Sequence, residues 1–158
     1  MKIFLFMACL AIMVFIGCTK KETWCTPVSP QAEEAQIIAY ASANSISVVK
    51  NSSGIFYEII DPGTGATPTR NSTVTTTYTG KLLNGTIFDS GTAESPLSGV
   101  IEGWQIGIPL IKKGGRIKLI IPSALAYGCN PVRKQNTEIV VIPANSVLYF
   151  DIVLDNVR

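Results

Sequence analysis

The sequence predicts an α+β domain in which an antiparallel β-sheet is covered on one side by a short helix. Short runs rich in β-branched and aromatic side chains recur between residues 55 and 154, and Gly, Pro and Asn separate them. One brief amphipathic stretch, Val100 to Ile111, predicts the helix. With 158 residues and 47% apolar composition, the chain can bury the core of one ordinary domain and carry a short extension.

Residues 1–17 are predicted to be a signal peptide of the lipoprotein type. A basic start precedes an uncharged apolar run that ends at Ile16, which is too short for a permanent membrane span but suits a signal-peptide core. Phe15 to Cys18 resembles a bacterial lipobox, although Phe15 stands where that motif usually has Leu. Cys18 would then be acylated and become the new N-terminus. The alternative is a buried N-terminal core helix, which the polar residues directly after Cys18 oppose.

The position of each of the four cysteines in the sequence suggests its fate. Cys9 would leave with the signal peptide and Cys18 would carry the lipid, which leaves Cys25 and Cys129. Acyl chains on Cys18 would hold the chain to a membrane, because each buried methylene contributes roughly 0.8 kcal/mol. Disulfides persist in exported proteins. The two remaining thiols therefore either pair, pinning the N-terminal segment to the domain, or stay as two free thiols.

Two parts are expected in the mature chain: a lipid-anchored tether at residues 18–50 and the folded domain at residues 51–158. Within the tether, Gln31 to Asn44 is rich in helix-forming residues, which predicts a short helix packed on the domain. Its apolar residues at helical spacing are Ala35, Ile38 and Ala39.

Turn residues divide the expected strands of the domain. Asn51 to Gly54 is a turn, and Asn84-Gly85 is the strongest hairpin signal, since a type I′ turn needs two residues that tolerate positive φ. Pro109 and Gly114-Gly115 end the helical stretch. The expected strands are Ile55–Ile60, Ser72–Leu83, Thr86–Phe88, Arg116–Ile121 and Val147–Leu154.

Composition argues against several classes of function. The chain has no His, which removes Ser–His and Cys–His nucleophile pairs and His-based metal sites. Its net charge is +2 with no long run of one sign, which argues against nucleic acid as the main partner. We therefore expect a function that needs no imidazole, no metal and no nucleic acid.

Several segments together carry a resemblance to one family. They are Val74–Gly80, Gly85–Ser90, Val100–Trp104, Ile121–Gly128 and Ile142–Asp151. In this order and spacing they resemble the signatures of FKBP-type peptidyl-prolyl cis–trans isomerases, over roughly residues 55–158. The resemblance implies an antiparallel, five- to six-stranded β-sheet, a common sheet size, wrapped around a short α-helix. It also implies a ligand pocket between helix and sheet, and no cofactor.

The same resemblance assigns the pocket residues. They are Tyr78, Phe88, Asp89, Val100, Ile101, Trp104, Tyr127, Ile142 and Phe150. It implies that the Trp104 ring lies under the bound proline, while the Ile101 N–H and the Tyr127 hydroxyl donate to ligand carbonyls. Asp89 either accepts hydrogen bonds that order the pocket or interacts with the distorted amide. Core packing would explain Ile142 and Phe150 as well, and a turn cap would explain Asp89.

The sequence departs from the family pattern at two places. The segment between Asp89 and Val100 is short and lacks the Phe that usually closes one pocket wall. Ala93, Ser95 or Leu97 must stand in for it. The polar, charged loop from Cys129 to Val141 corresponds to one that overhangs the pocket in relatives. Both departures bear on substrate preference and on affinity for macrolide inhibitors.

The leading hypothesis is a prolyl isomerase that assists the folding of exported proteins without covalent chemistry. Its substrates would be proline-containing unfolded or nascent polypeptides, and macrolide inhibitors are a further ligand class. We expect a monomer, lipid-anchored in the bacterial cell envelope on the periplasmic side or at the outer membrane. Two alternatives stay open. One is a membrane-anchored binding or chaperone module with little turnover, and the other is a lipoprotein for a non-prolyl ligand.

Overall fold

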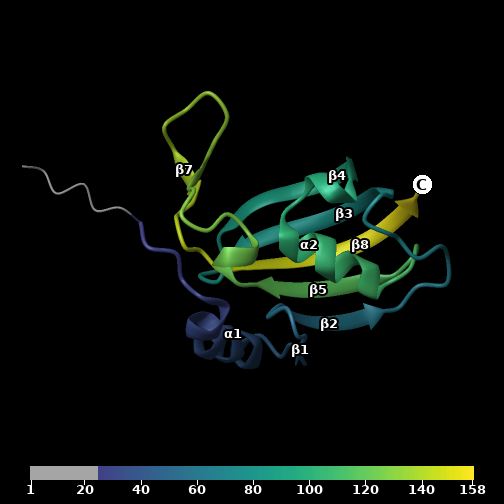
Figure 1. Ribbon diagram of the computed structural model, residues 1–158, viewed down its shortest axis with the longest axis horizontal. Coiled ribbons are helices and arrows are strands. Elements are labelled where there is room, and N and C mark those ends of the chain that lie inside the picture. The colour runs from purple at the N-terminus through teal and green to yellow at the C-terminus, as the bar shows by residue number, and fades with distance from the viewer. Residues whose placement is uncertain (1–24) are drawn as a thin grey trace, which may run out of the picture.

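A six-stranded antiparallel sheet forms the body of the molecule, with strand order β1-β2-β5-β8-β3-β4 (Figure 1). The computed structural model describes residues 25–158, so the predicted signal peptide and Cys18 lie outside the described residues. The strands are β1 Val49–Lys50, β2 Phe56–Asp61, β3 Thr73–Leu82, β4 Ile87–Pro96, β5 Arg116–Ile121 and β8 Leu148–Val157. The α+β class predicted from the sequence is confirmed, with β1 as a short additional edge strand.

Alternation along the central strands divides the sheet into two packed faces. On β5, Leu119 pairs with Phe150 of β8 and points into the main core, while Ile120 pairs with Tyr149 and points to the opposite face. The main core lies between the sheet and α2, Glu102–Gly107 (Figure 1). The opposite face is partly covered by α1, Pro30–Ala43.

Helix α2 is shorter than the predicted stretch from Val100 to Ile111. Val100 and Ile101 have extended backbone angles, so the helix begins at Glu102. At the other end it passes into a 3₁₀ turn at Ile108–Leu110. Pro109 explains this change, because it has no N–H to donate to a carbonyl in the preceding helical turn.

Two glycines allow α2 to lie directly on β5. A Cβ at Gly103 would stand 2.4 Å from the Ile121 side chain, and one at Gly107 would stand 2.6 Å from Leu119. Both distances are far below ordinary contact, so only glycine permits this approach. The close packing fixes the height of Trp104, which follows Gly103, above the sheet.

The hairpin turn between β3 and β4 differs from the predicted type I′. The backbone N–H of Gly85 donates to Leu82 O at 2.9 Å, and the Leu82 N–H donates to Thr86 O at 2.9 Å. Gly85 has φ 89°, but Asn84 does not have positive φ. The turn is therefore type I followed by a glycine bulge, which needs only one residue in the left-handed region.

Strand β4 extends well beyond the predicted Thr86–Phe88. It runs to Pro96, which pairs with Thr73 at the start of β3. The sequence of this part is rich in Ser, Gly and acidic residues and has low intrinsic strand propensity. It forms a strand because β3 offers a partner along its whole length. The segment that sequence reasoning treated as a short loop is thus one wall of the sheet.

Helix α1 agrees with the predicted Gln31–Asn44 within one residue at each end, but it buries a different face. Its buried residues are Glu33, Ile37 and Ala41. Ile38, which the apolar spacing placed toward the domain, is 50% exposed. The buried stripe includes a carboxylate, and hydrophobic periodicity cannot recognise such a stripe.

Past β5, the chain forms two smaller features before β8. A 3₁₀ turn at Ser123–Leu125 begins the loop that leads to Cys129. Strands β6, Val132–Arg133, and β7, Val140–Ile142, pair as a separate two-stranded hairpin that projects from the body (Figure 1). Across the described part of the chain, no helix combines the length and apolar composition needed to cross a bilayer.

Candidate functional site

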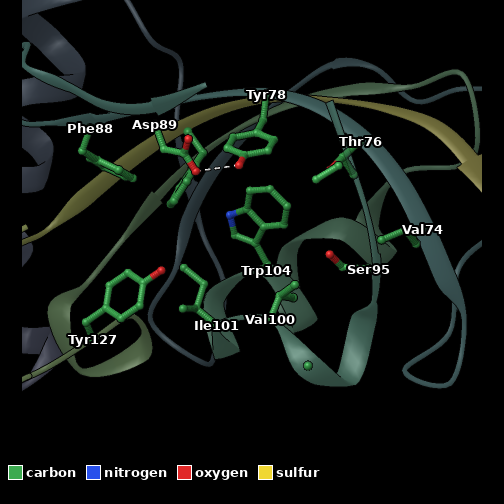
Figure 2. Close-up of a pocket in the computed structure, with 13 residues that line it drawn as sticks. Val74, Thr76, Tyr78, Phe88, Asp89, Ser95, Val100, Ile101, Trp104 and Tyr127 are labelled. Carbon is green, nitrogen blue, oxygen red and sulfur yellow. Dashed lines mark hydrogen bonds between the residues drawn. The ribbon is translucent and has the colours of Figure 1, made fainter. Parts of the chain in front are cut away.

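A cavity of about 310 Å³ opens between α2 and the concave face of the sheet (Figure 2). This size lies at the lower end of the range for small-molecule and peptide-residue sites. Its lining is mainly apolar and aromatic, with a few hydroxyls and one carboxyl group. The lining residues are Val74, Thr76, Tyr78, Phe88, Asp89, Ala93, Ser95, Gly99, Val100, Ile101, Trp104, Tyr127 and Phe150.

Trp104 forms the centre of an aromatic cluster at the bottom of the cavity (Figure 2). Its ring centroid lies 5.2 Å from Tyr78 and 5.2 Å from Phe150, in both cases at 83° between ring planes. Phe88 meets Phe150 edge to face at 5.6 Å. Edge-to-face contacts stabilise such clusters. They also leave ring faces free, and a flat apolar group can lie on them.

Gly80 makes room for this arrangement on β3. A Cβ there would stand 2.6 Å from Phe88 and 2.9 Å from Phe150. The bulge in the β3–β4 ladder at the same point pairs Gly80 with Asp89 and shifts the register before Lys81. A bulge re-aims the side chains around it. The bulge and the glycine together bring Phe88 over the sheet.

One buried side-chain donor and one backbone donor near the cavity have no acceptor among the described residues. The Trp104 indole N–H is buried and has no hydrogen-bond partner among residues 25–158. Within the same residues, the backbone N–H of Ile101 donates no hydrogen bond. Gln105 holds the segment before it, because its Nε2 donates to Val100 O at 2.7 Å. A ligand carbonyl would supply the acceptor that the Ile101 N–H lacks.

Tyr78 and Asp89 form the polar side of the rim (Figure 2). The Tyr78 hydroxyl donates to Asp89 Oδ2 at 2.6 Å. Burial first, and then this hydrogen bond, raise the pKa of Tyr78 from its ordinary 10.0 to about 12. Tyr78 therefore stays protonated at neutral pH and holds the Asp89 side chain in one orientation. This contact supports the ordering role among the two roles considered for Asp89.

Tyr127 lies across the opening from Asp89 (Figure 2) and is 38% exposed. Burial and the nearby Asp89 raise the pKa of its hydroxyl, so the group remains a donor at neutral pH. The ring is carried by the loop after β5, which Gly128 closes by donating its N–H to Ser123 O at 2.8 Å. The arrangement offers a dry aromatic cup below and hydrogen-bonding groups above.

Most of the sequence-predicted pocket residues come together, with one exception. Ile142 does not line the cavity: it is 2% exposed and packs in the main core from β7. Among the three residues proposed to replace the missing Phe, Ala93 and Ser95 line the cavity, whereas Leu97 is fully buried. Val74 and Thr76 also line it and were missed. The period of two along β3, counted back from Tyr78, is the signal that places both on the same face.

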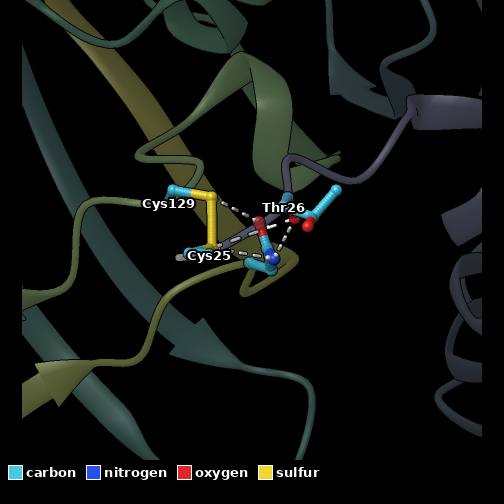
Figure 3. The surroundings of a disulfide bond; sticks show 4 residues. Cys25, Thr26 and Cys129 are labelled. Carbon is cyan, nitrogen blue, oxygen red and sulfur yellow. Dashed lines mark hydrogen bonds between the residues drawn. A yellow bond between two sulfur atoms is a disulfide. The ribbon is translucent and has the colours of Figure 1, made fainter. Parts of the chain in front are cut away.

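The two cysteines that the sequence left either paired or free, Cys25 and Cys129, are joined in the structure (Figure 3). Cys25 and Cys129 form a disulfide across a sequence separation of 104 residues, with Cα atoms 5.6 Å apart. Of the two alternatives left open by the sequence, the structure has the paired one. The remaining two cysteines, Cys9 and Cys18, lie outside the described residues.

Comparison with known sequences shows which proteins the chain resembles. Residues 65–155, more than half of the chain, match the sequence model of the FKBP-type peptidyl-prolyl cis–trans isomerases. The isomerase FkpA of Buchnera aphidicola subsp. Schizaphis graminum is 45% identical over 117 residues, covering 70% of this chain and 44% of that protein. FkpA of Escherichia coli K12 is 41% identical over 116 residues, covering 70% and 40%. The chain therefore spans less than half the length of these relatives.

Solved structures show the same similarity. The crystal structure of FkpA from Escherichia coli superposes with a TM-score of 0.67 at 35% identity, covering 82% of this chain and 61% of that one. A peptidyl-prolyl cis–trans isomerase from Pseudomonas syringae superposes with a TM-score of 0.67 at 29% identity, covering 84% and 98%. With the aromatic cavity and the matched sequence segments, these likenesses establish that the chain belongs to the FKBP-type peptidyl-prolyl cis–trans isomerase family.

Proposed function

We propose that the chain catalyses cis–trans isomerisation of X–Pro bonds in exported polypeptides. The observation that carries the proposal is the aromatic cavity over Trp104 in a chain of this family. A proline ring fits the flat apolar floor, and its flanking carbonyls match the free donors at Ile101 and the hydroxyl of Tyr127. We expect neither a metal nor a cofactor to be needed.

The chemistry of the reaction suits such a site. Amide resonance opposes rotation about the X–Pro bond, and uncatalysed exchange takes tens to hundreds of seconds. In the twisted transition state resonance is lost, so the carbonyl becomes less polar and the nitrogen more pyramidal. A dry aromatic cup favours this state over the planar amide, and fixed donors at its rim hold the neighbouring carbonyls. Catalysis then needs no nucleophile and no strong acid.

An isomerase assay on the full chain in detergent micelles tests the proposal. A protease-free proline tetrapeptide assay is expected to show turnover, and Asp89→Val is expected to lower it severely while the melting temperature stays close to the wild-type value. A macrolide inhibitor of the family should compete with the peptide. Absence of turnover would contradict the isomerase function, whereas turnover that Asp89→Val leaves unchanged would contradict a role of Asp89 in it.

A second candidate function is a binding or chaperone module with little turnover. The observation that favours it is the open wall at Ala93 and Ser95, where no aromatic ring closes the cavity. Binding without turnover requires that the planar amide be held as tightly as the twisted one. This function would be supported if the chain suppresses aggregation of an unfolded model protein but does not accelerate cis–trans isomerisation of the peptide. Absence of both peptide turnover and binding of unfolded chains would instead favour a non-prolyl ligand.

The cellular setting is also part of the proposal. We infer that Cys18 is lipidated and that the chain acts as a monomer at the bacterial cell envelope, since the apolar segment before Gly17-Cys18 has the features of a lipoprotein signal. Metabolic labelling with an alkyne-tagged palmitate in a bacterial host is expected to mark the wild-type chain. Cys18→Ser should abolish the label, whereas Cys25→Ser should retain it. Sedimentation in micelles would report the oligomeric state.

A further inference from the structure

The segment from Cys25 to Ala43, called the strap below, lies outside the region matched by the family model, which begins at residue 65. It nevertheless contacts the loop of residues 122–129, called the Tyr127 loop below, at both ends. One contact is a buried carboxylate and the other is a disulfide. Neither is expected of a tether that only connects a domain to its anchor.

Glu33 makes the first contact from the first turn of α1. It is only 2% exposed, and its Oε2 accepts a hydrogen bond from the backbone N–H of Ser123 at 2.7 Å. Charged side chains are rarely this buried without a partner, because desolvation is costly. Ser123 is itself fully buried and begins a 3₁₀ turn, whose first N–H groups have no acceptor within the turn. Glu33 supplies the acceptor that this loop lacks.

The second contact closes the other end of the loop (Figure 3). Cys129 is joined to Cys25 by the disulfide. Asn145 reinforces the junction from the segment before β8. Its backbone N–H donates to Gly128 O at 2.7 Å, and its Nδ2 donates to Thr26 O at 2.9 Å. The strap and the loop are therefore linked covalently and through a shared side chain.

Tyr127 lies between these two attachments. Ser123 precedes it and Cys129 follows it on the same short loop. The loop has no strand partner there, and its internal hydrogen bonds close it on itself, with Ala126 and Gly128 both donating to Ser123 O. The position of the Tyr127 hydroxyl at the cavity rim thus depends on what anchors the loop from outside. In the described chain, the strap supplies an anchor at each end.

We propose that the strap positions Tyr127 for catalysis: Glu33 and the Cys25–Cys129 disulfide together hold the Tyr127 loop against the cavity, and opening either attachment lowers isomerase activity without unfolding the domain. The inference rests on the isomerase function proposed above. Glu33 is a positioning residue, since it touches no substrate and acts through the Ser123 amide. Reduction opens the second attachment: a dithiol gives two electrons and two protons to the disulfide, which yields two thiols and an oxidised dithiol.

Substitution of Glu33 in the full chain, purified in detergent micelles, tests the first attachment. Glu33→Ala is expected to lower kcat/KM for a proline tetrapeptide about tenfold, since a displacement of a catalytic group by about 1 Å can cost up to about 10²-fold. Glu33→Gln keeps an acceptor oxygen and should recover most of the activity. Glu34→Ala is the matched control, because Glu34 is the next residue on α1 and is a surface partner of Lys50. It should change kcat/KM by less than about twofold.

A double-mutant cycle separates positioning from general destabilisation. If Glu33 acts through Tyr127, Glu33→Ala should cost at most about twofold in a Tyr127→Phe background, where the hydroxyl to be positioned is gone. All rates are measured well below the lowest melting temperature in the set. An equal loss in both backgrounds would show that Glu33 only stabilises the fold, and it would overturn the proposal.

Reduction tests the second attachment. Dithiothreitol is expected to lower kcat/KM of the wild-type chain several-fold, while intact-mass measurement confirms the gain of two hydrogens per disulfide opened. The Cys25→Ser/Cys129→Ser double variant should have the same low activity in both conditions, which controls for any effect on Cys9 and Cys18. A reduced wild-type chain with undiminished activity would contradict the role of the disulfide.

Amide hydrogen exchange supplies a readout that does not depend on turnover. In Glu33→Ala and in the reduced chain, we expect faster exchange at Ser123, Ala126 and Gly128, with unchanged exchange in β3 and β8. If the wild-type chain shows no isomerase activity at all, the proposed function fails. Hydrogen exchange still tests whether the strap holds the Tyr127 loop in place. Unchanged exchange across the Tyr127 loop would overturn the proposed role of the strap, even in a fully active enzyme.

Discussion

Helices pack on both faces of the sheet, but one packed face contains an aromatic cavity and the other a buried cluster. On the α2 face, aromatic rings meet edge to face and leave a cavity of about 310 Å³. On the α1 face, Ile37, Ala41 and Ile120 form a buried cluster with Phe56 and Tyr149, and the three aliphatic residues are at most 2% exposed. Aliphatic side chains can fill the space beside a ring, whereas the rigid rings held at right angles around Trp104 leave space between them.

The difference separates a face built for binding from one built for stability. The α2 face carries the unpaired Ile101 N–H and hydroxyls beside the apolar rings, and the α1 face carries a buried cluster plus Glu33, the one buried carboxylate among residues 25–158. Substitutions of cavity-lining residues on the α2 face should therefore change activity more than stability. Substitutions in the aliphatic cluster of the α1 face should do the opposite.

The largest effect on activity is expected for Trp104→Leu. Leu fills part of the core volume but offers no flat ring to the proline, so kcat/KM should fall by about 10²-fold, equivalent to roughly 2.7 kcal/mol of transition-state stabilisation. The protease-free peptide assay measures the fall, and circular dichroism checks that the variant is folded. Activity within twofold of the wild type would remove Trp104 from the binding floor.

The corresponding test of the α1 face is Ile120→Ala. Ile120 is fully buried, and its truncation should lower the free energy of unfolding by about 2–5 kcal/mol. Urea denaturation measures this loss. At temperatures where the variant is fully folded, kcat/KM should stay within about twofold of wild type, because the residue points away from the cavity. A large loss of activity in the folded variant would mean that the two faces are not independent.

Alkaline pH should weaken both faces together. Tyr78 on the α2 face and Tyr149 on the α1 face both have a pKa raised by burial to about 12, above the ordinary 10.0. Their contribution to stability is therefore complete below pH 10 and is lost as pH rises from 10 through 12. Unfolding midpoints measured across this range should fall, and they should fall less steeply in Tyr78→Phe/Tyr149→Phe. An identical slope in that double variant would contradict the assignment.

The smallest effect is expected where the cavity wall is open. Ala93→Phe would place a ring on the cavity lining and supply an aromatic contact worth about 0.5–1.5 kcal/mol. Affinity for a macrolide inhibitor should rise about two- to tenfold, measured by isothermal titration calorimetry. Thr92→Phe, on the same strand but facing away from the cavity, is the control. Weaker binding in Ala93→Phe would mean that the open wall is needed for access.

Much of the fold could be predicted because local patterns and global packing agree. The alternation in Arg116–Ile121 predicted β5 to the residue, and turn residues located the β3–β4 hairpin. The predictions were wrong where a contact with a segment distant in sequence determined the length or orientation of an element. Strand β4 extends to Pro96 because β3 pairs with it, and α1 rotates Ile38 outward because Ser123 provides a donor for Glu33. Neither partner is adjacent in sequence, so no local pattern contains this information.

For the site, the family resemblance assigned Trp104, Tyr78 and Phe150 to a pocket, and all three line the cavity in the structure. Ile142 was placed in the pocket by the same reasoning, yet it packs in the core, since a position on a short connecting strand does not determine its depth. By itself, the sequence determined the sheet, the family and the aromatic residues of the floor. Only the tertiary structure decided that Cys25 and Glu33 reach the loop of Tyr127, because contacts across about a hundred residues depend on how the whole chain closes.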